Sequence, residues 1–361
     1  IGKPLAVGGT GPRAVLSSAS YEARRWGVRS AMPTAQALRL CSQLVIVEPD
    51  FSLYSDLSKK VFQVIEKYAP VFERVSVDEG YLDMTGTEKL FGPPLEAAAR
   101  IRAEIAQQVG LPSSVGIGSN RLVAKIATDQ AKPNGELWVL PGTEAVFLAP
   151  LAVSVIPGVG PATTKWLHEH GFFKISDLQS VPAGQLEAAL GEHGQQLWDR
   201  AHGRGSTEFF REAKNPSISR ETTFSKDVRD PERIERLIWG RCEELGRELR
   251  SEDRYATTVR LKLRYPPFET VARSRVLDLP TRLDRDLFEA AHALLLAHWA
   301  PDRPLRLVGV GFAVGEGVGQ FQLFESPENP ERWARLDQLK DRIRAKFGHD
   351  ALGLGRNVKT E

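Results

Sequence analysis

The chain has 361 residues, of which 42% are hydrophobic and 26% are charged, and its formal net charge is +2. This length suits roughly two to four domains, and the apolar share is sufficient for real cores. The small net charge argues against a uniformly basic nucleic-acid-binding surface, so any such contact must come from local patches. The two cysteines, Cys41 and Cys242, cannot form a disulfide framework or a zinc site. No apolar run approaches membrane-spanning length and no secretory signal is visible, so we expect a cytoplasmic protein that does not bind a membrane.

Residues 1–50 are expected to alternate short strands with two helices, one from Tyr21 and one over residues 33–41. The hydroxyl-rich start of segment 17–28 suits a helix N-cap, and Tyr21 and Arg24 are spaced to share a helix face. An arginine fork matches phosphate oxygens and a neighbouring tyrosine hydroxyl can donate to the same group, so this face is a candidate phosphate site. The alternative is ordinary packing of an arginine beside a tyrosine on a short surface helix.

Two adjacent carboxylates, Asp78 and Glu79, follow the β-formers Val75 and Val77. Neighbouring strand residues point to opposite faces, so the two carboxylates can share an ion only where the strand ends or bends. We expect Gly80 to supply that bend. Mg²⁺ is usually held by one or two carboxylates plus substrate phosphates, which makes a nucleotide the natural partner. The alternative is a solvated acidic pair at a turn.

The surrounding pattern predicts an α+β unit, with helices over residues 54–68, 95–109 and 120–130 and strands over 76–84, 113–118 and 137–140. After the last of these helices, Pro133, Asn134 and Gly135 form a turn that would hold Lys132 rigidly. By default, a lysine at such a turn is simply solvated.

From Glu144 to about Arg204 the pattern is helical, and Gly158 and Gly160 stand before a helix that begins near Pro161. Such glycines let backbone N–H groups approach an anion at the positive end of a helix. This arrangement is typical of a helix-hairpin-helix, which grips DNA phosphates without reading sequence. A plain helix C-cap is the alternative.

A polar linker over residues 208–219 leads to a second α+β unit. Its clearest strand, 259–264, alternates apolar residues with Arg260, Lys262 and Arg264, which should line one sheet face. Arg273 and Arg275 are expected to repeat this row of cations on a second strand. A cationic sheet face suits a duplex backbone, although a solvated antiparallel face is an equal alternative.

A glycine-rich spacer, residues 315–319, precedes the pentapeptide Gln320-Phe321-Gln322-Leu323-Phe324. Apolar anchors on a polar tail usually mark a partner site. We expect a final helix to pack on its own protein through an apolar side made of Trp333, Leu336, Leu339, Ile343 and Phe347.

Four of these segments, taken together, resemble the Y-family DNA polymerases and most closely the bacterial polymerase IV branch. The matching stretches are SSASYEARRWGVRSAMPTAQAL (17–38), SVDEGYLDMTGT (76–87), VGIGSNRLVAKIATDQAKPNGELWVL (115–140) and IPGVGPATTKWL (156–167). They follow the family's order and spacing, so the resemblance extends to about residue 314. It implies an error-prone, translesion DNA polymerase that adds nucleotides to a primer 3′-hydroxyl.

The implied fold is α+β and multidomain, in the right-hand arrangement of a palm, small fingers, a helical thumb and a little finger. The expected domains are a fingers region (1–50), a palm (51–142), a thumb with the helix-hairpin-helix (143–207), a linker (208–219), an α+β little finger (220–314) and a tail (315–361).

The resemblance also implies site residues and partners. Asp78 and Glu79 would be catalytic ligands of two Mg²⁺ ions, beside the small polar residue Ser76. The incoming triphosphate would be bound by Ser18, Tyr21, Arg24 and Lys132. The DNA duplex would be contacted by Gly158, Gly160, Arg260, Lys262, Arg264, Arg273 and Arg275. A sliding clamp would be bound through Gln320, Leu323 and Phe324, as in the clamp-binding motif of bacterial polymerases. The partners are thus primer-template DNA, a dNTP and the clamp, and we expect a monomer.

Two positions depart from the family pattern. Gly80 replaces the usual alanine, which we expect to change the flexibility of the turn rather than the chemistry. The sequence starts at Ile1, after the family's opening strand and helix, and we expect truncation because loss of a central strand would expose a sheet edge. The resemblance places another metal-binding aspartate, a carbonyl ligand and the side chain that screens the sugar 2′ position in that opening element.

Two rival functions belong to other classes. A non-catalytic scaffold that binds DNA and the clamp would need neither Asp78 nor the triphosphate residues. A helix-hairpin-helix glycosylase or nuclease would not explain Arg24 and Lys132 as a triphosphate-binding set.

Overall fold

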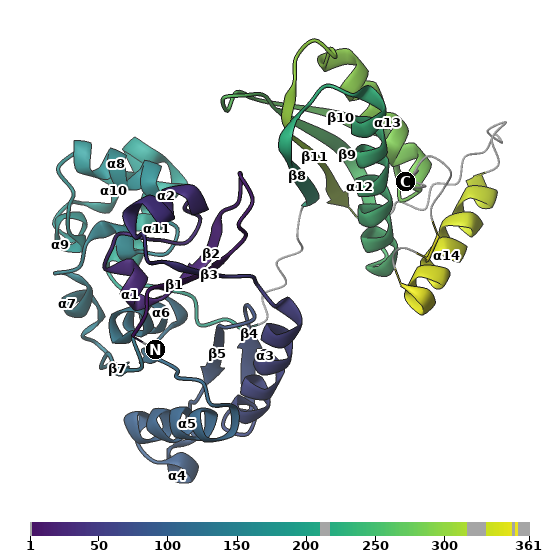
Figure 1. Ribbon diagram of the computed structural model, residues 1–361. Helices are drawn as coiled ribbons and strands as arrows, with labels where there is room; N and C mark the ends of the chain where they lie inside the picture. The colour runs from purple at the N-terminus through teal and green to yellow at the C-terminus, as the bar shows by residue number, and fades with distance from the viewer. Residues whose placement is uncertain (1, 210–216, 316–329, 349–350, 353–361) are drawn as a thin grey trace. The chain divides into compact units, whose positions relative to one another are not determined.

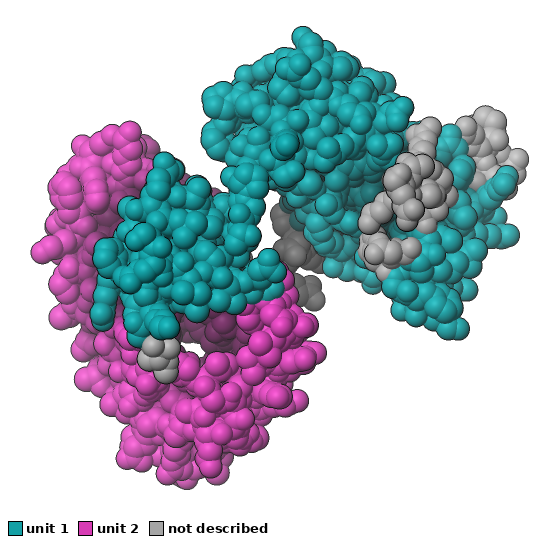
Figure 2. Space-filling view, in the orientation of Figure 1, with its two compact units in different colours: residues 1–49, 213–361 teal, residues 50–212 magenta. Residues whose placement is uncertain are grey.

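The computed structural model describes residues 2–209, 217–315, 330–348 and 351–352. Clustering of backbone contacts divides the chain into two compact units. Unit 1 comprises residues 1–49 and 213–361, and unit 2 comprises residues 50–212 (Figure 2).

The first segment of unit 1 is a small sheet in the order β2–β1–β3, in which β1 pairs antiparallel with β2 and parallel with β3. Its elements are β1 (Leu5–Gly8), β2 (Leu16–Ala19), α1 (Tyr21–Arg24), α2 (Thr34–Leu40) and β3 (Val45–Val47). A buried cluster that includes Ala6, Leu16 and Val28 forms its core. The expected alternation of short strands with two helices is confirmed.

The first half of unit 2 joins helices to two strand pairs, β4 with β5 antiparallel and β6 with β7 parallel. Its elements are α3 (Phe51–Ile65), β4 (Val71–Arg74), β5 (Gly80–Asp83), α4 (Glu88–Phe91), α5 (Pro94–Val109), β6 (Val115–Ile117), α6 (Arg121–Ala131) and β7 (Glu136–Trp138). Side chains cap two of the helices, because Asp50 accepts from the Leu53 amide and Asn120 accepts from the Val123 amide. The expected helices and strands are present, although the strand predicted over 76–84 is shorter.

The second half of unit 2 is helical, as expected. Its elements are α7 (Glu144–Leu148), the 3₁₀ turn η1 (Val153–Val155), α8 (Pro161–Glu169), α9 (Ile175–Gln179), α10 (Ala183–Leu190) and α11 (Glu192–Ala201). Ile126 of α6 is part of the buried core of these helices, so both halves of unit 2 share apolar contacts.

Residues 217–315 form an antiparallel sheet in the order β10–β9–β11–β8, called here the C-terminal sheet. The elements of this segment are β8 (Ser217–Val228), α12 (Pro231–Ser251), β9 (Tyr255–Arg264), β10 (Thr270–Thr281), α13 (Asp284–His298) and β11 (Leu305–Gly315). Helices α12 and α13 cover one face (Figure 1), and buried residues such as Ile238, Leu261 and Leu295 fill the core between helices and sheet. The other face is called here the open face.

The final helix, α14 (Pro330–Phe347), packs on this domain through buried charged residues and through part of the expected apolar side, of which Trp333, Leu336 and Ile343 are half-buried. Leu339 and Phe347 are 53% and 66% exposed, whereas Asp337, Lys340 and Arg344 are buried. The Lys340 ammonium pairs with Glu243 of α12 at 3.1 Å and with Asp284 of α13 at 2.6 Å. The expectation that the helix packs on its own protein is confirmed, but its most buried side chains are charged and lie beside the expected apolar ones, because carboxylates on α12 and α13 pair with Lys340 and Arg344.

Within the described residues, no helix combines the length and the apolar character that crossing a bilayer requires.

Candidate active site

Asp78 and Glu79 lie in the tight loop that joins β4 to β5. The amides of Val75 and Ser76 donate to the Glu79 carbonyl at 3.0 and 3.1 Å, which closes the loop. Val75 and Val77 therefore belong to the loop and not to a strand, and they are 50% and 55% exposed. The two carboxylates therefore lie at the junction of two strands, as the sequence analysis expected when it placed them where a strand ends or bends.

Hydrogen bonds from α3 and β4 brace this loop. The Ser58 hydroxyl, on α3, donates to the Val77 carbonyl. Arg74 donates to the Ser76 carbonyl at 3.1 Å and to the Ser58 hydroxyl at 2.9 Å. The Ser76 hydroxyl donates to Asp78 at 2.6 Å, as suits a small polar residue beside the site. Ser58 and Arg74 were missed by the sequence analysis because local periodicity does not reveal contacts between separate elements.

Gly80 does not supply the bend through backbone freedom, because its φ is not in the left-handed region. A Cβ at this position would lie 2.8 Å from the Phe62 ring and 3.1 Å from the Glu73 carbonyl. The expectation about the bend is therefore wrong, and close packing against Phe62 is what favours glycine here.

Helix α6 packs its charged side against the β4–β5 hairpin. Arg121 donates to both carboxylate oxygens of Glu73, at 2.8 and 3.1 Å, and lies 4.4 Å from the centre of the Tyr81 ring. One turn later, the Lys125 ammonium contacts the Glu79 carboxylate. A row of ion pairs thus holds the carboxylate hairpin against α6.

The pKa of Lys125 reflects two opposing effects. Partial burial lowers it, but the hydrogen bond to Glu79 and the charges of Asp129 and Glu79 outweigh burial, and the pKa is raised. Lys125 is therefore a cation at neutral pH, placed directly beside a candidate metal ligand.

Lys132 lies at the C-terminal end of α6, where its ammonium pairs with Asp129 at 2.8 Å. Arg102, on α5, braces the turn that follows, because it donates to the Asn134 carbonyl at 2.7 Å and to the Glu136 carboxylate at 2.9 Å. A bend is present at residues 133–134, where the turn was expected, and Arg102 contacts it. The sequence analysis missed Arg102, Lys125 and Asp129, although the four-residue spacing of the last two was a visible signal.

Ser18, Tyr21 and Arg24 gather in unit 1 around helix α1. The Arg24 guanidinium lies 5.1 Å from the centre of the Tyr21 ring, so the two side chains share a face as expected. Arg24 also donates to the Ala19 carbonyl at 3.0 Å. Ser20 is the N-cap of α1 and accepts from the Ala23 amide. The set is exposed on unit 1, whereas Asp78, Glu79 and Lys132 belong to unit 2.

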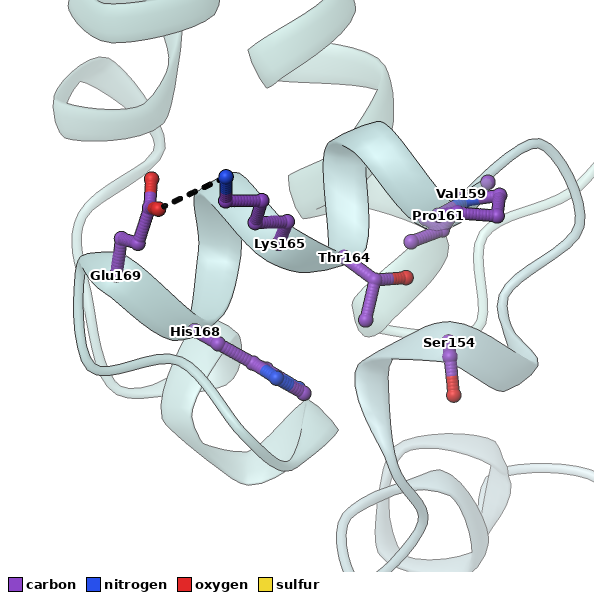
Figure 3. Close-up of a pocket in the computed structure, with 8 residues that line it drawn as sticks. Ser154, Val159, Pro161, Thr164, Lys165, His168 and Glu169 are labelled. Carbon is purple, nitrogen blue, oxygen red and sulfur yellow. Dashed lines mark ion pairs between the residues drawn. The ribbon is translucent and has the colours of Figure 1, made fainter.

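An open hollow of about 800 Å³ lies at the start of α8 (Figure 3). Gly160 is the N-cap of α8, and Gly158 has a φ of +90° that favours glycine. Lys165 and Glu169, which form a 3.8 Å pair, border this hollow together with Thr164. This is the geometry expected of a helix-hairpin-helix.

The cations of the C-terminal sheet do not all share a face. Residues directly opposite each other in an antiparallel ladder point to the same face. Arg273 lies opposite the buried Leu261, and Arg275 lies opposite the buried Val259. These two arginines therefore repeat the pattern on edge strand β10 as expected and remain exposed, but they lie on its helix-covered face and not beside Arg260, Lys262 and Arg264.

Arg260, Lys262 and Arg264 do line the open face, because the alternating Val259, Leu261 and Leu263 are buried. Lys262 pairs with Glu221 of β8 at 2.7 Å, above Gly309 of the intervening strand. A Cβ at Gly309 would lie 2.8 Å from the Glu221 side chain, so glycine makes room for this pair.

Comparison with known proteins identifies the family. A model of the impB/mucB/samB family matches residues 1–129, and a model of its C-terminal domain matches residues 215–322. A model described as the DNA polymerase-iota thumb domain matches residues 154–204. DNA polymerase IV of Dehalococcoides mccartyi strain CBDB1 is 35% identical over 359 residues, covering 99% of this chain and 92% of that protein. The chain belongs to the Y-family of DNA polymerases.

Other relatives agree with this assignment. DNA polymerase IV of Caulobacter vibrioides is 35% identical over 359 residues, covering 99% of this chain and 88% of that protein. A Y-family chimera, Dbh-Dpo4(243-245)-Dbh, has the same fold, with a TM-score of 0.70 at 24% identity, covering 86% of this chain and 92% of that one. An insertion ternary complex of Dbh DNA polymerase gives a TM-score of 0.58 over 88% of this chain and 93% of that one. The right-hand α+β fold is thereby confirmed, and the protein is a DNA-directed DNA polymerase of the translesion type.

Y-family polymerases depend on divalent metal ions. In the described part of the polymerase, no three His, Cys, Asp or Glu side chains gather closely enough to form a metal site by themselves. Asp78 and Glu79 nevertheless fit a hard cation that takes its other ligands from phosphate and water, because both offer carboxylate oxygens on a braced loop.

The clamp-binding candidates Gln320, Leu323 and Phe324 lie outside the described residues.

Proposed function

We propose that Asp78 and Glu79 are the catalytic carboxylates of this polymerase and that they bind Mg²⁺, two ions in all during catalysis. The observation that carries this proposal is the braced β4–β5 loop, which presents adjacent carboxylates next to the cationic side of α6. Mg²⁺ in such sites promotes deprotonation of the primer 3′-hydroxyl and neutralises the charge that develops on the phosphates.

The protein's own side chains would do the remaining work on the nucleotide. Arg24 offers a planar fork to phosphate oxygens and Lys132 offers a compact charge, while the Tyr21 and Ser18 hydroxyls can donate hydrogen bonds. These donors would orient the triphosphate and neutralise it in the transition state. The exposure of Tyr21 and Arg24 and the braced turn after Lys132 support this assignment.

DNA contact would be divided between two surfaces. The amides around Gly158 and Gly160 face the start of α8, and Arg260, Lys262 and Arg264 line the open face of the C-terminal sheet. We assign Arg273 and Arg275 to the flank of the same duplex-binding domain, because they lie on its edge strand and point away from the open face.

Three further features complete the proposal. A sliding clamp would bind Gln320, Leu323 and Phe324, the protein would act as a monomer, and it would work in the bacterial cytoplasm. The polymerase IV relatives come from bacteria, which supports the last of these. The domains are proposed as fingers (1–50), palm (51–142), thumb (143–207), linker (208–219), little finger (220–314) and tail (315–361).

Primer extension tests the catalytic assignment. Asp78→Ala should abolish single-nucleotide addition with Mg²⁺ while binding to primer-template DNA persists, because the proposed duplex contacts lie on other elements. Equal loss of extension and of DNA binding would contradict the assigned role of Asp78. If the parent bound DNA but extended no primer, the protein would instead be a DNA- and clamp-binding scaffold, the alternative that family membership does not favour.

A further inference from the structure

Helix α6 links the candidate metal ligand Glu79 to the candidate triphosphate ligand Lys132 through an alternating row of charges. The row, called here the charge ladder, consists of Glu79, Lys125, Asp129 and Lys132. Lys125 contacts the Glu79 carboxylate and lies 3.7 Å from that of Asp129. The other oxygen of Asp129 lies 2.8 Å from the Lys132 ammonium.

The spacing on α6 produces this arrangement. Residues three and four apart lie on the same helix face, so Lys125, Asp129 and Lys132 follow one another along a single side. Asp129 therefore stands between two lysines and contacts both. The side chains of Asp129 and Lys132 are 45% and 41% exposed, so a ligand from solvent can reach this pair.

The backbone around Lys132 is held independently of Asp129. Arg102 donates to the carbonyl and to the side-chain oxygen of Asn134, at 2.7 and 3.0 Å. Breaking the ion pair with Asp129 would therefore redirect the Lys132 side chain without releasing the turn. The ammonium can exchange one anionic partner for another while its Cα stays in place.

We propose that Asp129 is an internal counter-ion that occupies Lys132 until a nucleotide binds, and that it thereby sets the affinity of the polymerase for dNTPs. This inference rests on the proposed role of Lys132. A phosphate oxygen and the Asp129 carboxylate are both anionic acceptors, so they compete for the same ammonium. Asp129 also brings a negative charge towards the triphosphate, which weakens binding further.

Asp129 is on this basis a positioning residue, since it acts through Lys132 and not on the reacting atoms. Competition for Lys132 and repulsion of the triphosphate both disappear when the charge of Asp129 is removed. The free energy of each effect is comparable to that of an exposed ion pair on a helix. Together they correspond to dNTP binding that is about two- to fivefold tighter in Asp129→Asn. A role limited to holding the fold predicts the opposite direction, because a damaged site does not bind its ligand more tightly.

The test is equilibrium binding of the correct dNTP to the protein on a primer-template whose primer ends in a dideoxynucleotide, so that no chemistry occurs. Asp56→Asn is the matched control, because Asp56 and Lys59 form an exposed pair of the same spacing on α3 at 3.3 Å. Asp129→Asn should tighten binding, while Asp56→Asn and the charge-retaining Asp129→Glu should bind dNTP like the parent. The gain should shrink as salt rises from about 0.05 to 0.5 M, because salt screens exposed charges.

Unchanged or weaker binding in Asp129→Asn, relative to Asp56→Asn, would overturn the inference. Lys132→Ala separates this failure from failure of the proposed function. If Lys132→Ala weakens dNTP binding but Asp129→Asn does not tighten it, Lys132 remains a triphosphate ligand and only the counter-ion role is wrong. If Lys132→Ala binds as tightly as the parent, the assigned role of Lys132 and the inference fail together.

Discussion

Helix α14 should detach from its domain when Lys340 is replaced by methionine. The Lys340 side chain is 2% exposed, and its ammonium pairs with Glu243, Asp284 and Asp337 at 3.1, 2.6 and 2.9 Å. Methionine keeps most of the apolar stem but removes the charge. The three carboxylates would then be buried around a missing cation, with Arg250 and Arg344 left to offset them.

The expected cost follows from this geometry. Removing one partner of a buried ion pair costs about 3–5 kcal/mol, because the remaining charge is desolvated without compensation. The apolar residues of α14 contribute less than its charges, since Leu339 and Phe347 are largely exposed and Trp333, Leu336 and Ile343 are only half-buried. Undocking returns the carboxylates to water, so the helix should leave its site rather than accept the full penalty. An isolated helix of 18 residues is only marginally stable, so it should also lose helical structure.

Hydrogen exchange provides the assay. In Lys340→Met, amides of α14 should exchange much faster than in the parent, while amides of the C-terminal sheet keep their protection. Lys346→Met is the matched control, because Lys346 is exposed on the same helix. Parental protection of α14 in Lys340→Met would refute the view that the buried charges hold this helix.

Two further predictions concern packing and charge. Burial raises the pKa of Asp284 to about 6, above its ordinary 3.8, so the folded state binds this proton more tightly than the unfolded state. Its contribution is fully present below about pH 4 and is lost as pH rises through about 6. As the pH is lowered from 7 to 5, the free energy of unfolding of the parent should rise, and that of Asp284→Asn should rise less. An equal rise in the two proteins would contradict this cause. Gly80→Ala should destabilise unit 2 by about 1–3 kcal/mol in urea titrations, because its Cβ would press on the Phe62 ring, and Phe62→Leu in the same chain should recover part of the loss. No recovery would show that the ring is not the obstacle.

The sequence by itself was sufficient for the order of elements, since that order depends on local signals, whereas the candidate residues were named through the resemblance to a known family. Helix α6 could be anticipated from its residue pattern, and strand β9 from its strict alternation. Asp78 and Glu79 stood out as two carboxylates beside β-formers, but the pattern alone left a solvated acidic pair open, and the family resemblance made them candidate metal ligands. Sequence signals of this kind depend only on residues that are close together in the chain.

Only the tertiary structure decided which charges meet. Lys125 pairs with Glu79, 46 positions away, and Lys340 pairs with Glu243, 97 positions away. Strand register, not alternation within one strand, places Arg273 opposite the buried Leu261 and so away from the open face. The buried face of α14 was likewise unpredictable from its own sequence, because an apolar stripe is favoured only when the partner surface is apolar. On α12 and α13 that surface is charged, and burying a charge requires that its partner lie there too.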